Sequence, residues 1–126
     1  MPLRFSGLGD LERAVMDTLW AHGPGLTVRE VHERLSDRDL AYTTVMTVLD
    51  RLAKKDLTTR EREGRAWRYS PAHSREELTA ASMRSGLQSL DSTDRRQAML
   101  HFLGDAEPGE IADLKAALAE VERRHD

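Results

Sequence analysis

Residues 42–55 carry a helical pattern that leads directly into a pattern of two strands, and this order limits the folds open to the chain. Aliphatic side chains recur at helical spacing along one side of the segment, at Val45, Val48, Leu49 and Leu52. Residues 57–62 and 65–69 are strand-like and are joined by Glu63-Gly64, where glycine can supply the positive φ that a tight turn needs. The sequence therefore predicts an amphipathic helix followed by a two-stranded hairpin.

Two further helical patterns precede this unit. An apolar stripe predicts a helix over residues 10–22, which Gly23-Pro24-Gly25 stops. Thr27 and Glu30 have the spacing of a capping box and open a second, short helix, after which residues 36–39 form a polar connector. Three helices followed by a hairpin, with a short polar turn between the second and third helices, is the plan of a helix-turn-helix domain with a wing.

Three more helices are predicted after the hairpin. They cover about residues 75–90, 94–103 and 108–124, and the first of them opens with a second capping box at Ser74-Arg75-Glu76-Glu77. We therefore predict a mainly α chain in two parts. Residues 1–73 form a winged helix-turn-helix domain of three helices and a hairpin wing, and residues 74–126 form a region of three helices.

Several classes of protein are disfavoured by what the sequence lacks. It has no cysteine, and its five histidines do not pair at a metal-ligand spacing on one helix face, so we expect no disulfide and no metal site. It has no glycine-rich phosphate loop and no nucleophile with a base at a catalytic spacing, so we expect neither an enzyme nor a bound cofactor. No apolar run approaches the roughly 20 residues of a membrane helix, and we expect no leader peptide and a cytoplasmic location.

Charge is distributed unevenly along the chain, whose formal net charge is −3. Residues 1–75 hold 13 basic and 11 acidic residues, whereas residues 76–126 hold 6 basic and 11 acidic residues. Within residues 51–68 there are seven basic residues and only three acidic ones. Because salt screens charges beyond about 10 Å, this local positive field is what a polyanion would meet.

The polar side of residues 42–55 has the chemistry of a helix that reads DNA. The major groove of B-form DNA admits one helix, whose outer face then meets base edges, and a neighbouring hairpin can follow the phosphate backbone. The residues predicted to contact DNA are Thr43, Thr44, Met46, Thr47, Arg51 and Lys54 on the helix, and Arg62, Arg65 and Arg68 on the hairpin.

Other interpretations of these residues stay open. The polar side of the helix can simply be solvated and salt-bridged. Asp50 lies on the same side, where its carboxylate can accept from a cytosine amino group or pair with Arg51 or Lys54. Trp67 and Tyr69 can stack on single-stranded bases, but as neighbours on one strand face they are more typical of residues that pack a hairpin onto helices.

The C-terminal helices carry more apolar surface than three short helices bury within one chain. Residues 108–124 have a heptad-like seam, and the two helices before them add further apolar residues. The residues predicted to form a dimer interface are Met83, Leu87, Leu90, Met99, Phe102, Leu103, Ile111, Leu114, Leu118 and Val121. A two-fold dimer predicts a palindromic operator with half-sites about 34 Å apart, or a multiple of it. Packing of these residues on the first domain is the alternative.

Residues 41–55, together with the opening stretch from Leu8 to Trp20 and residues 64–69, resemble the penicillinase-repressor (BlaI/MecI) family. The resemblance implies an operator-binding dimeric repressor whose C-terminal region dimerises. It also implies inactivation by proteolysis in that region, triggered through a membrane-bound sensor metalloprotease. Thr43, Thr44, Thr47 and Arg51 fall on operator-contacting or motif positions of the family, and His101-Phe102 falls where some members have an Asn-Phe cleavage bond.

The predicted function is a homodimeric repressor that binds a double-stranded DNA operator and is relieved by proteolysis. Two alternatives stay open, of which the first belongs to another class. The first is a winged-helix protein–protein adapter without DNA binding. The second is a DNA-binding regulator that senses a small ligand, for which the composition offers few aromatic residues to form a pocket.

Overall fold

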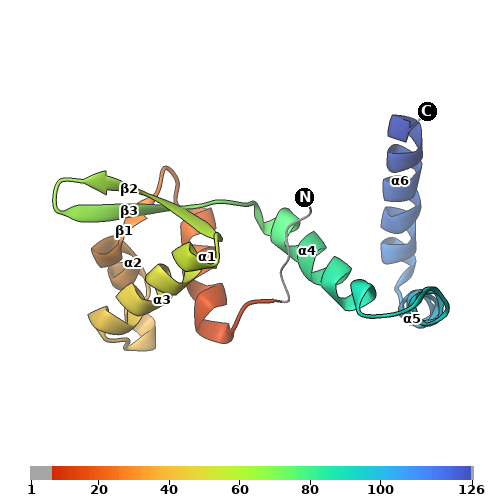
Figure 1. The fold of residues 1–126 in the computed structure, drawn as a ribbon, viewed down its shortest axis with the longest axis horizontal. Helices are drawn as coiled ribbons and strands as arrows, with labels where there is room; N and C mark the ends of the chain where they lie inside the picture. The colour runs from red at the N-terminus through yellow and green to blue at the C-terminus, as the bar shows by residue number, and fades with distance from the viewer. Residues whose placement is uncertain (1–6, 126) are drawn as a thin grey trace. The chain divides into compact units, whose positions relative to one another are not determined.

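The computed structural model describes residues 7–125 and divides the chain into two compact units, one ending at Ser85 and the other beginning at Gly86. The first unit contains helices α1 to α3, a small sheet and the first turns of α4 (Figure 1). The second unit contains the end of α4, with α5 and α6. The mainly helical winged-helix architecture predicted from the sequence is thus present in the first unit.

The three helices of the first unit agree with the sequence patterns. They are α1 (Asp10–Ala21), α2 (Val28–Arg34) and α3 (Tyr42–Lys54). The predicted capping box forms at the start of α2, where the Thr27 hydroxyl accepts from the Glu30 amide at 3.2 Å and the Glu30 carboxylate accepts from the Thr27 amide at 2.9 Å.

The connector between α2 and α3 is more ordered than its polar sequence indicated. Residues Ser36–Arg38 form a single 3₁₀ turn, η1, and Asp39 follows with φ of 53° in the left-handed region. Asp tolerates this conformation better than most residues because its short polar side chain can bond locally. The turn redirects the chain so that α3 crosses against α2.

The sheet has three strands rather than the two that the sequence predicted. Strands β2 (Thr58–Glu63) and β3 (Ala66–Pro71) form the antiparallel wing, and β1 (Leu26–Thr27) pairs with the other edge of β3. The strand order is β1-β3-β2. A two-residue strand has no periodicity to detect, and its pairing partner on β3 is more than 40 residues away, so β1 left no signal in the sequence.

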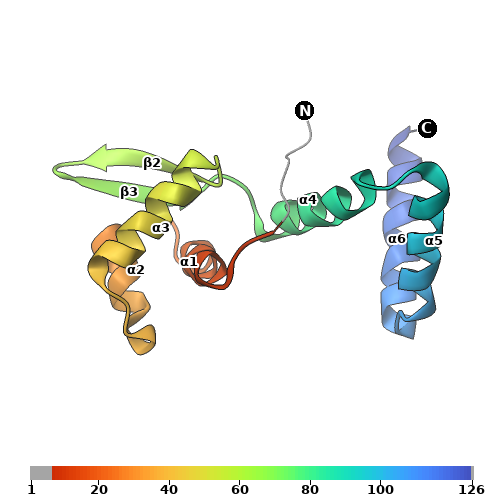
Figure 2. The same cartoon turned by 60° about the horizontal axis from the view of Figure 1, so that its bottom comes forward.

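Two glycines are required by the geometry of the sheet. Gly64 has φ of +63° at the first central position of the two-residue wing turn, which is the glycine position of a type II′ hairpin. Gly25 has φ of +129°, and a Cβ atom there would lie 2.6 Å from the Ser70 hydroxyl oxygen and 3.0 Å from the Tyr69 carbonyl oxygen. Figures 1 and 2 show that the wing turn projects past the helices.

One continuous core holds α1, α2, α3 and the sheet together. Most residues of the predicted apolar faces are buried in it, and Leu8, Leu11, Trp20 and Val28 are partly buried against it. The buried ones are Val15, Met16, Leu19, Val31, Leu35, Val45, Val48, Leu49, Leu52, Leu57 and Tyr69. Burial of each large aliphatic side chain contributes about 1.5–3 kcal/mol. Four of the buried residues belong to α3, so the orientation of α3 about its own axis is fixed and its opposite side faces outward.

Helix α4 (Arg75–Gln88) begins as part of the first unit. Leu78 and Ala81 are buried there, and the Trp20 indole nitrogen donates to the His73 carbonyl oxygen at 2.9 Å. The Arg75 guanidinium lies 2.6 Å from the Asp17 carboxylate and 4.7 Å from the Trp20 ring. The predicted domain boundary before Ser74 coincides with the start of α4, whereas the compact units part within this helix; the functional division at that point stays a prediction.

The second unit has no core of its own in the described part of the chain. No described residue of α5 (Ser92–Gly104) or α6 (Pro108–His125) is buried. Large apolar side chains are exposed instead, at Met99, Leu100, Phe102, Leu103, Leu118 and Val121, and Met83 on α4 in the first unit is exposed as well. These helices therefore present apolar surface that the single chain does not cover.

Candidate nucleic-acid interface

Helix α3 exposes the side that the sequence assigned to DNA. Among the predicted contact residues, Thr43, Met46, Thr47, Arg51 and Lys54 are exposed and Thr44 is half-buried. Met46 is 44% exposed, a large value for an apolar side chain. The exposed side combines hydroxyls, cations and one flexible apolar group, which is the set that contacts base edges, phosphates and thymine methyl groups.

The hydroxyl group of Thr47 already has a partner within α3. It donates to the Thr43 carbonyl oxygen at 2.9 Å, one helical turn earlier. While this bond holds, Thr47 offers a base only its hydroxyl lone pairs and its methyl group. The bond also restricts the rotamer of Thr47, so this part of the surface is ordered before any ligand arrives.

Asp50 forms ion pairs on the same side of α3. Its Oδ2 atom lies 3.1 Å from Nζ of Lys54, one of the two partners that the sequence suggested. Its Oδ1 atom lies 3.8 Å from a terminal nitrogen of Arg60 on β2. Arg60 was not among the predicted site residues, although its alternation with Arg62 on one strand face was a signal that pointed to it.

Trp67 organises the cations of the wing. The guanidinium carbon of Arg60 lies 4.5 Å from the centre of the Trp67 ring, and that of Arg62 lies 5.2 Å from it. Arg62 also donates to the Gly64 carbonyl oxygen at 3.2 Å. Such cation–π contacts position the guanidinium groups without neutralising their charge. Arg65, on the turn itself, is exposed and has no ion-pair partner among residues 7–125.

Arg68 points into the protein. Its guanidinium donates to the Gly25 carbonyl oxygen at 2.7 Å, to Glu30 at 3.2 Å and to the carboxylate of Glu63. Hydrogen bonding and charge from Glu63, with a contribution from Glu30, raise the pKa of Arg68, and Arg68 in turn lowers the pKa of Glu63. The structure thus gives Arg68 the role of tying β3 to α2, and a contact with DNA remains a prediction for this residue.

The aromatic residues of the wing pack onto the helices, as the strand pattern indicated. Tyr69 is buried in the core, and Trp67 is half-buried against it. Tyr69 is therefore not available to stack on bases. Trp67 has two guanidinium groups within cation–π distance, so its main contacts are also within the protein.

A buried carboxylate ties the end of α3 to α1. The Glu12 carboxylate lies 2.8 Å from Nζ of Lys55 and accepts from the Gly9 amide at 3.1 Å. Burial alone would raise the pKa of Glu12, but the bonds from Lys55 and Gly9 and the charge of Arg51 outweigh it and lower the pKa. Lys55 therefore has a structural role, whereas its neighbour Lys54 lies on the predicted DNA-binding side.

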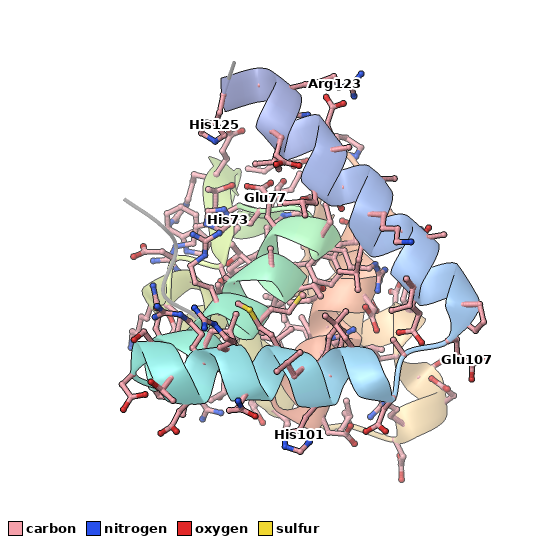
Figure 3. All side chains as sticks on the ribbon, turned by 90° about the vertical axis from the view of Figure 1, so that its right-hand side faces the viewer. His73, Glu77, His101, Glu107, Arg123 and His125 are labelled. Atoms are coloured by element: carbon pink, nitrogen blue, oxygen red, sulfur yellow. The ribbon has the colours of Figure 1, made fainter. Side chains whose placement is uncertain are left out.

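The predicted dimer residues divide into two groups. Met83, Met99, Phe102, Leu103, Leu118 and Val121 are exposed, and Leu87, Leu90, Ile111 and Leu114 are half-buried. His101 projects away from α5 (Figure 3), and both it and Phe102 are exposed within that helix. The bond between them, the predicted cleavage site, is thus part of a regular helix.

Residues 7–125 contain no group of three or more His, Asp or Glu side chains arranged to hold a metal ion. The described helices include none that is long and apolar enough to cross a membrane. The closest His–carboxylate pair is His73 and Glu77, 3.7 Å apart at the start of α4 (Figure 3), and it belongs to the turn that caps this helix.

Comparisons with known proteins agree with this architecture. A family model described as penicillinase repressor matches residues 8–120. The transcriptional regulator BlaI of Mycobacterium tuberculosis, in two strains, is 53% identical over 124 residues, covering 97% of this chain and 90% of that protein.

Two solved structures are similar in fold. They are the DNA-binding domain of the repressor BlaI, with a TM-score of 0.52, and the monomeric form of Bacillus licheniformis BlaI in complex with the blaP half-operator, with a TM-score of 0.50. Each is 29% identical and covers 59% of this chain and 90% of its own. The predicted winged helix-turn-helix fold is thereby confirmed.

Proposed function

This chain belongs to the penicillinase-repressor family, and from that premise we propose that it is a homodimeric repressor whose two α3 helices bind a palindromic operator. The observation that carries the proposal is the two-sided nature of α3. Its aliphatic side is fully buried, and its other side exposes hydroxyls and cations beside the cations of the wing. The role of a transcriptional regulator is not enzymatic, in agreement with the sequence prediction.

In the proposed complex, α3 lies in the major groove and the wing follows the phosphate backbone. Arg51 and Lys54 lie on the last turn of α3, and Arg62 and Arg65 lie on the projecting wing. The relative bound to a half-operator supports this mode, because its fold is similar and its ligand is half of an operator. A helix and a hairpin that are fixed in one core can engage groove and backbone together.

The proposed dimer uses the exposed apolar surface of α5 and α6. Phe102 is 53% exposed and Leu118 is 61% exposed, and side chains of this kind are rarely left in water over a contiguous surface. A second copy of the same chain supplies a matching apolar surface under two-fold symmetry. Two DNA-binding units related in this way require a palindromic operator.

Relief of repression is proposed to follow cleavage of the His101–Phe102 bond by a protease linked to a membrane sensor, with the repressor itself in the cytoplasm. A protease cleft binds its substrate as an extended strand, so α5 must open locally before the bond is cut. No described residue of α5 is buried within the single chain, so in a free monomer little packing opposes that opening, whereas in the proposed dimer the contacts of Phe102 have to part first.

The experiment that tests the proposal is a titration of the full chain with a duplex carrying the region upstream of its own gene. A repressor shows a roughly linear fall of log affinity with log salt, of about 0.9 for each phosphate neutralised. Sedimentation at micromolar concentration reports the dimer in parallel. A chain that binds no duplex at about 50 mM salt is an adapter rather than a repressor.

A further inference from the structure

We propose that Asp50 is a positioning residue that sets the specificity of DNA binding. Its carboxylate holds one cation of α3 and one cation of the wing, and it thereby suppresses binding to unrelated sequences. The inference rests on the proposed function, because it assumes that this surface binds duplex DNA. It also adds Arg60 to the residues that meet the phosphate backbone.

The carboxylate of Asp50 joins the two elements that form the DNA-binding surface. Each of its oxygens pairs with one cation. Oδ2 lies 3.1 Å from Nζ of Lys54 on α3, and Oδ1 lies 3.8 Å from the Arg60 guanidinium on β2. The Asp50 side chain is 45% exposed, so it lies at the surface and not beneath it. An acidic group at this place repels phosphates unless the two cations compensate for it.

Arg60 is held from its other side as well. Its guanidinium lies 4.5 Å from the Trp67 ring, and Trp67 is packed against the core. Arg60 thus lies between the Trp67 indole, which is packed on the core, and the Asp50 carboxylate on the surface of α3. Arg65 has no such restraint among the described residues, although it lies on the same hairpin.

The hold of Asp50 on Lys54 and Arg60 affects binding to an operator and binding to an unrelated duplex differently. On an operator, base contacts fix the register of the protein, so cations held at a constant separation meet phosphates in one arrangement. On an unrelated duplex the register is not fixed. There a cation contributes most to binding when its side chain can move to the nearest phosphate. Exposed ion pairs are weak, so phosphates can displace Asp50, but this carboxylate then stays as a local repulsion.

The test compares Asp50→Asn with the wild type on an operator duplex and on a scrambled duplex of equal length, from about 50 to about 200 mM salt. We expect the variant to bind the scrambled duplex about 3- to 10-fold more tightly and to change operator affinity by less than about 2-fold. On the scrambled duplex the slope of log affinity against log salt should steepen by about 0.9, the value for one more phosphate neutralised. Asp50→Glu should keep the wild-type ratio of the two affinities.

Glu61→Gln is the matched control, because Glu61 is an exposed carboxylate on β2 that makes no ion pair within residues 7–125. It removes the same charge and should change both affinities by one common factor. Arg60→Gln combined with Asp50→Asn should cancel most of the effect on the scrambled duplex. Thermal melting of each variant verifies that the domain is folded.

Two results would overturn the inference. The first is an Asp50→Asn variant that changes both affinities by the same factor as Glu61→Gln. The second is a variant that loses operator affinity with no change of salt slope on either duplex, which would assign Asp50 to a base contact. If the wild type shows no preference for the operator, it is the proposed function that fails, and the two failures are therefore distinguishable.

Discussion

The ammonium group of Lys55, at the end of α3, lies 2.8 Å from the buried carboxylate of Glu12 on α1. The Glu12 side chain is only 12% exposed, and it also accepts from the Gly9 amide that caps α1. One carboxylate therefore fixes both the start of α1 and the position at which α3 ends.

Replacement of Glu12 by Gln should destabilise the first unit by about 1–3 kcal/mol at neutral pH, because a charged acceptor is lost beside Lys55. The folded-state pKa of Glu12 is lowered, so its contribution is present above the unfolded pKa and is lost as pH falls through the folded value. Denaturant midpoints measured at pH 7 and near pH 3 check this. The difference between wild type and variant should shrink at the lower pH.

The control for Glu12 is Glu33→Gln, since Glu33 is exposed and, among residues 7–125, pairs only with Arg29 one turn away. It should change the unfolding free energy by less than about 0.5 kcal/mol at either pH. An equal effect of the two variants would contradict the assignment of a structural role to Glu12.

Substitution of Arg68 should mainly lower the stability of the protein, whereas substitution of Arg65 should mainly lower its affinity for DNA. Arg68→Met removes bonds to Gly25, Glu30 and Glu63, and it should lower the denaturation midpoint clearly below that of the wild type. Arg65→Met should leave stability within about 0.5 kcal/mol and weaken binding to all duplexes alike. Chemical denaturation and anisotropy titrations of the two variants check both halves of the prediction. A stable Arg68→Met protein would mean that its bonds in the fold are dispensable.

Arg51→Ala should weaken operator binding by about 1–3 kcal/mol if Arg51 contacts a base edge. The side chain is exposed near the end of α3, and Leu52 beside it is buried, so truncation of Arg51 should leave the fold intact. The measurement is the affinity for operator and for random duplex under the same salt. An equal loss on both would reassign Arg51 to a phosphate.

Leu118→Glu should convert the proposed dimer to monomer. Leu118 is 61% exposed in the single chain, so the substitution removes no core contact, whereas in a dimer it places a charge within an apolar interface. The dissociation constant should rise by more than about tenfold, or ~1.4 kcal/mol, as followed by sedimentation. The melting temperature of the winged-helix unit should be unchanged. A fully dimeric variant would show that α6 lies outside the interface.

Gly25→Ala should destabilise the first unit by about 1–3 kcal/mol because Gly25 has φ of +129° and lies against β3. Gly23→Ala is its counterpart, since a Cβ atom at Gly23 meets nothing within 4 Å. Thermal melts of the two variants check the difference. Equal melting temperatures would show that the loop before β1 can adjust.

The sequence predicted the helices well because each depends on local information. Val45, Val48, Leu49 and Leu52 recur at helical spacing, and a helical period together with an end signal identifies the element and the side it buries. The same reasoning found both capping boxes. The fold class followed from the order of these elements alone.

What the sequence did not predict depends on contacts between distant residues. Strand β1 exists only because Leu26 pairs with Tyr69. Arg62 and Arg68 are both arginines on strands of the wing, and the sequence does not distinguish them. Arg68 is nevertheless turned inward, because the Gly25 carbonyl and the carboxylates of Glu30 and Glu63 bind its guanidinium. The pairing of Asp50 with Arg60 likewise required the angle between α3 and the wing.

The bonds that tie α4 to the first unit also determine what a cut in α5 would release. Leu78 is buried against the winged helix, and Arg75 and His73 are held by Asp17 and Trp20, all upstream of residue 101. A severed chain would thus keep an intact DNA-binding unit and lose the part of the proposed dimer contact that lies beyond residue 101. Because tethered units act at a high effective concentration, their separation lowers occupancy by orders of magnitude without any unfolding. Release would then follow from the loss of two-site binding, and one broken peptide bond in either subunit would be enough to begin it.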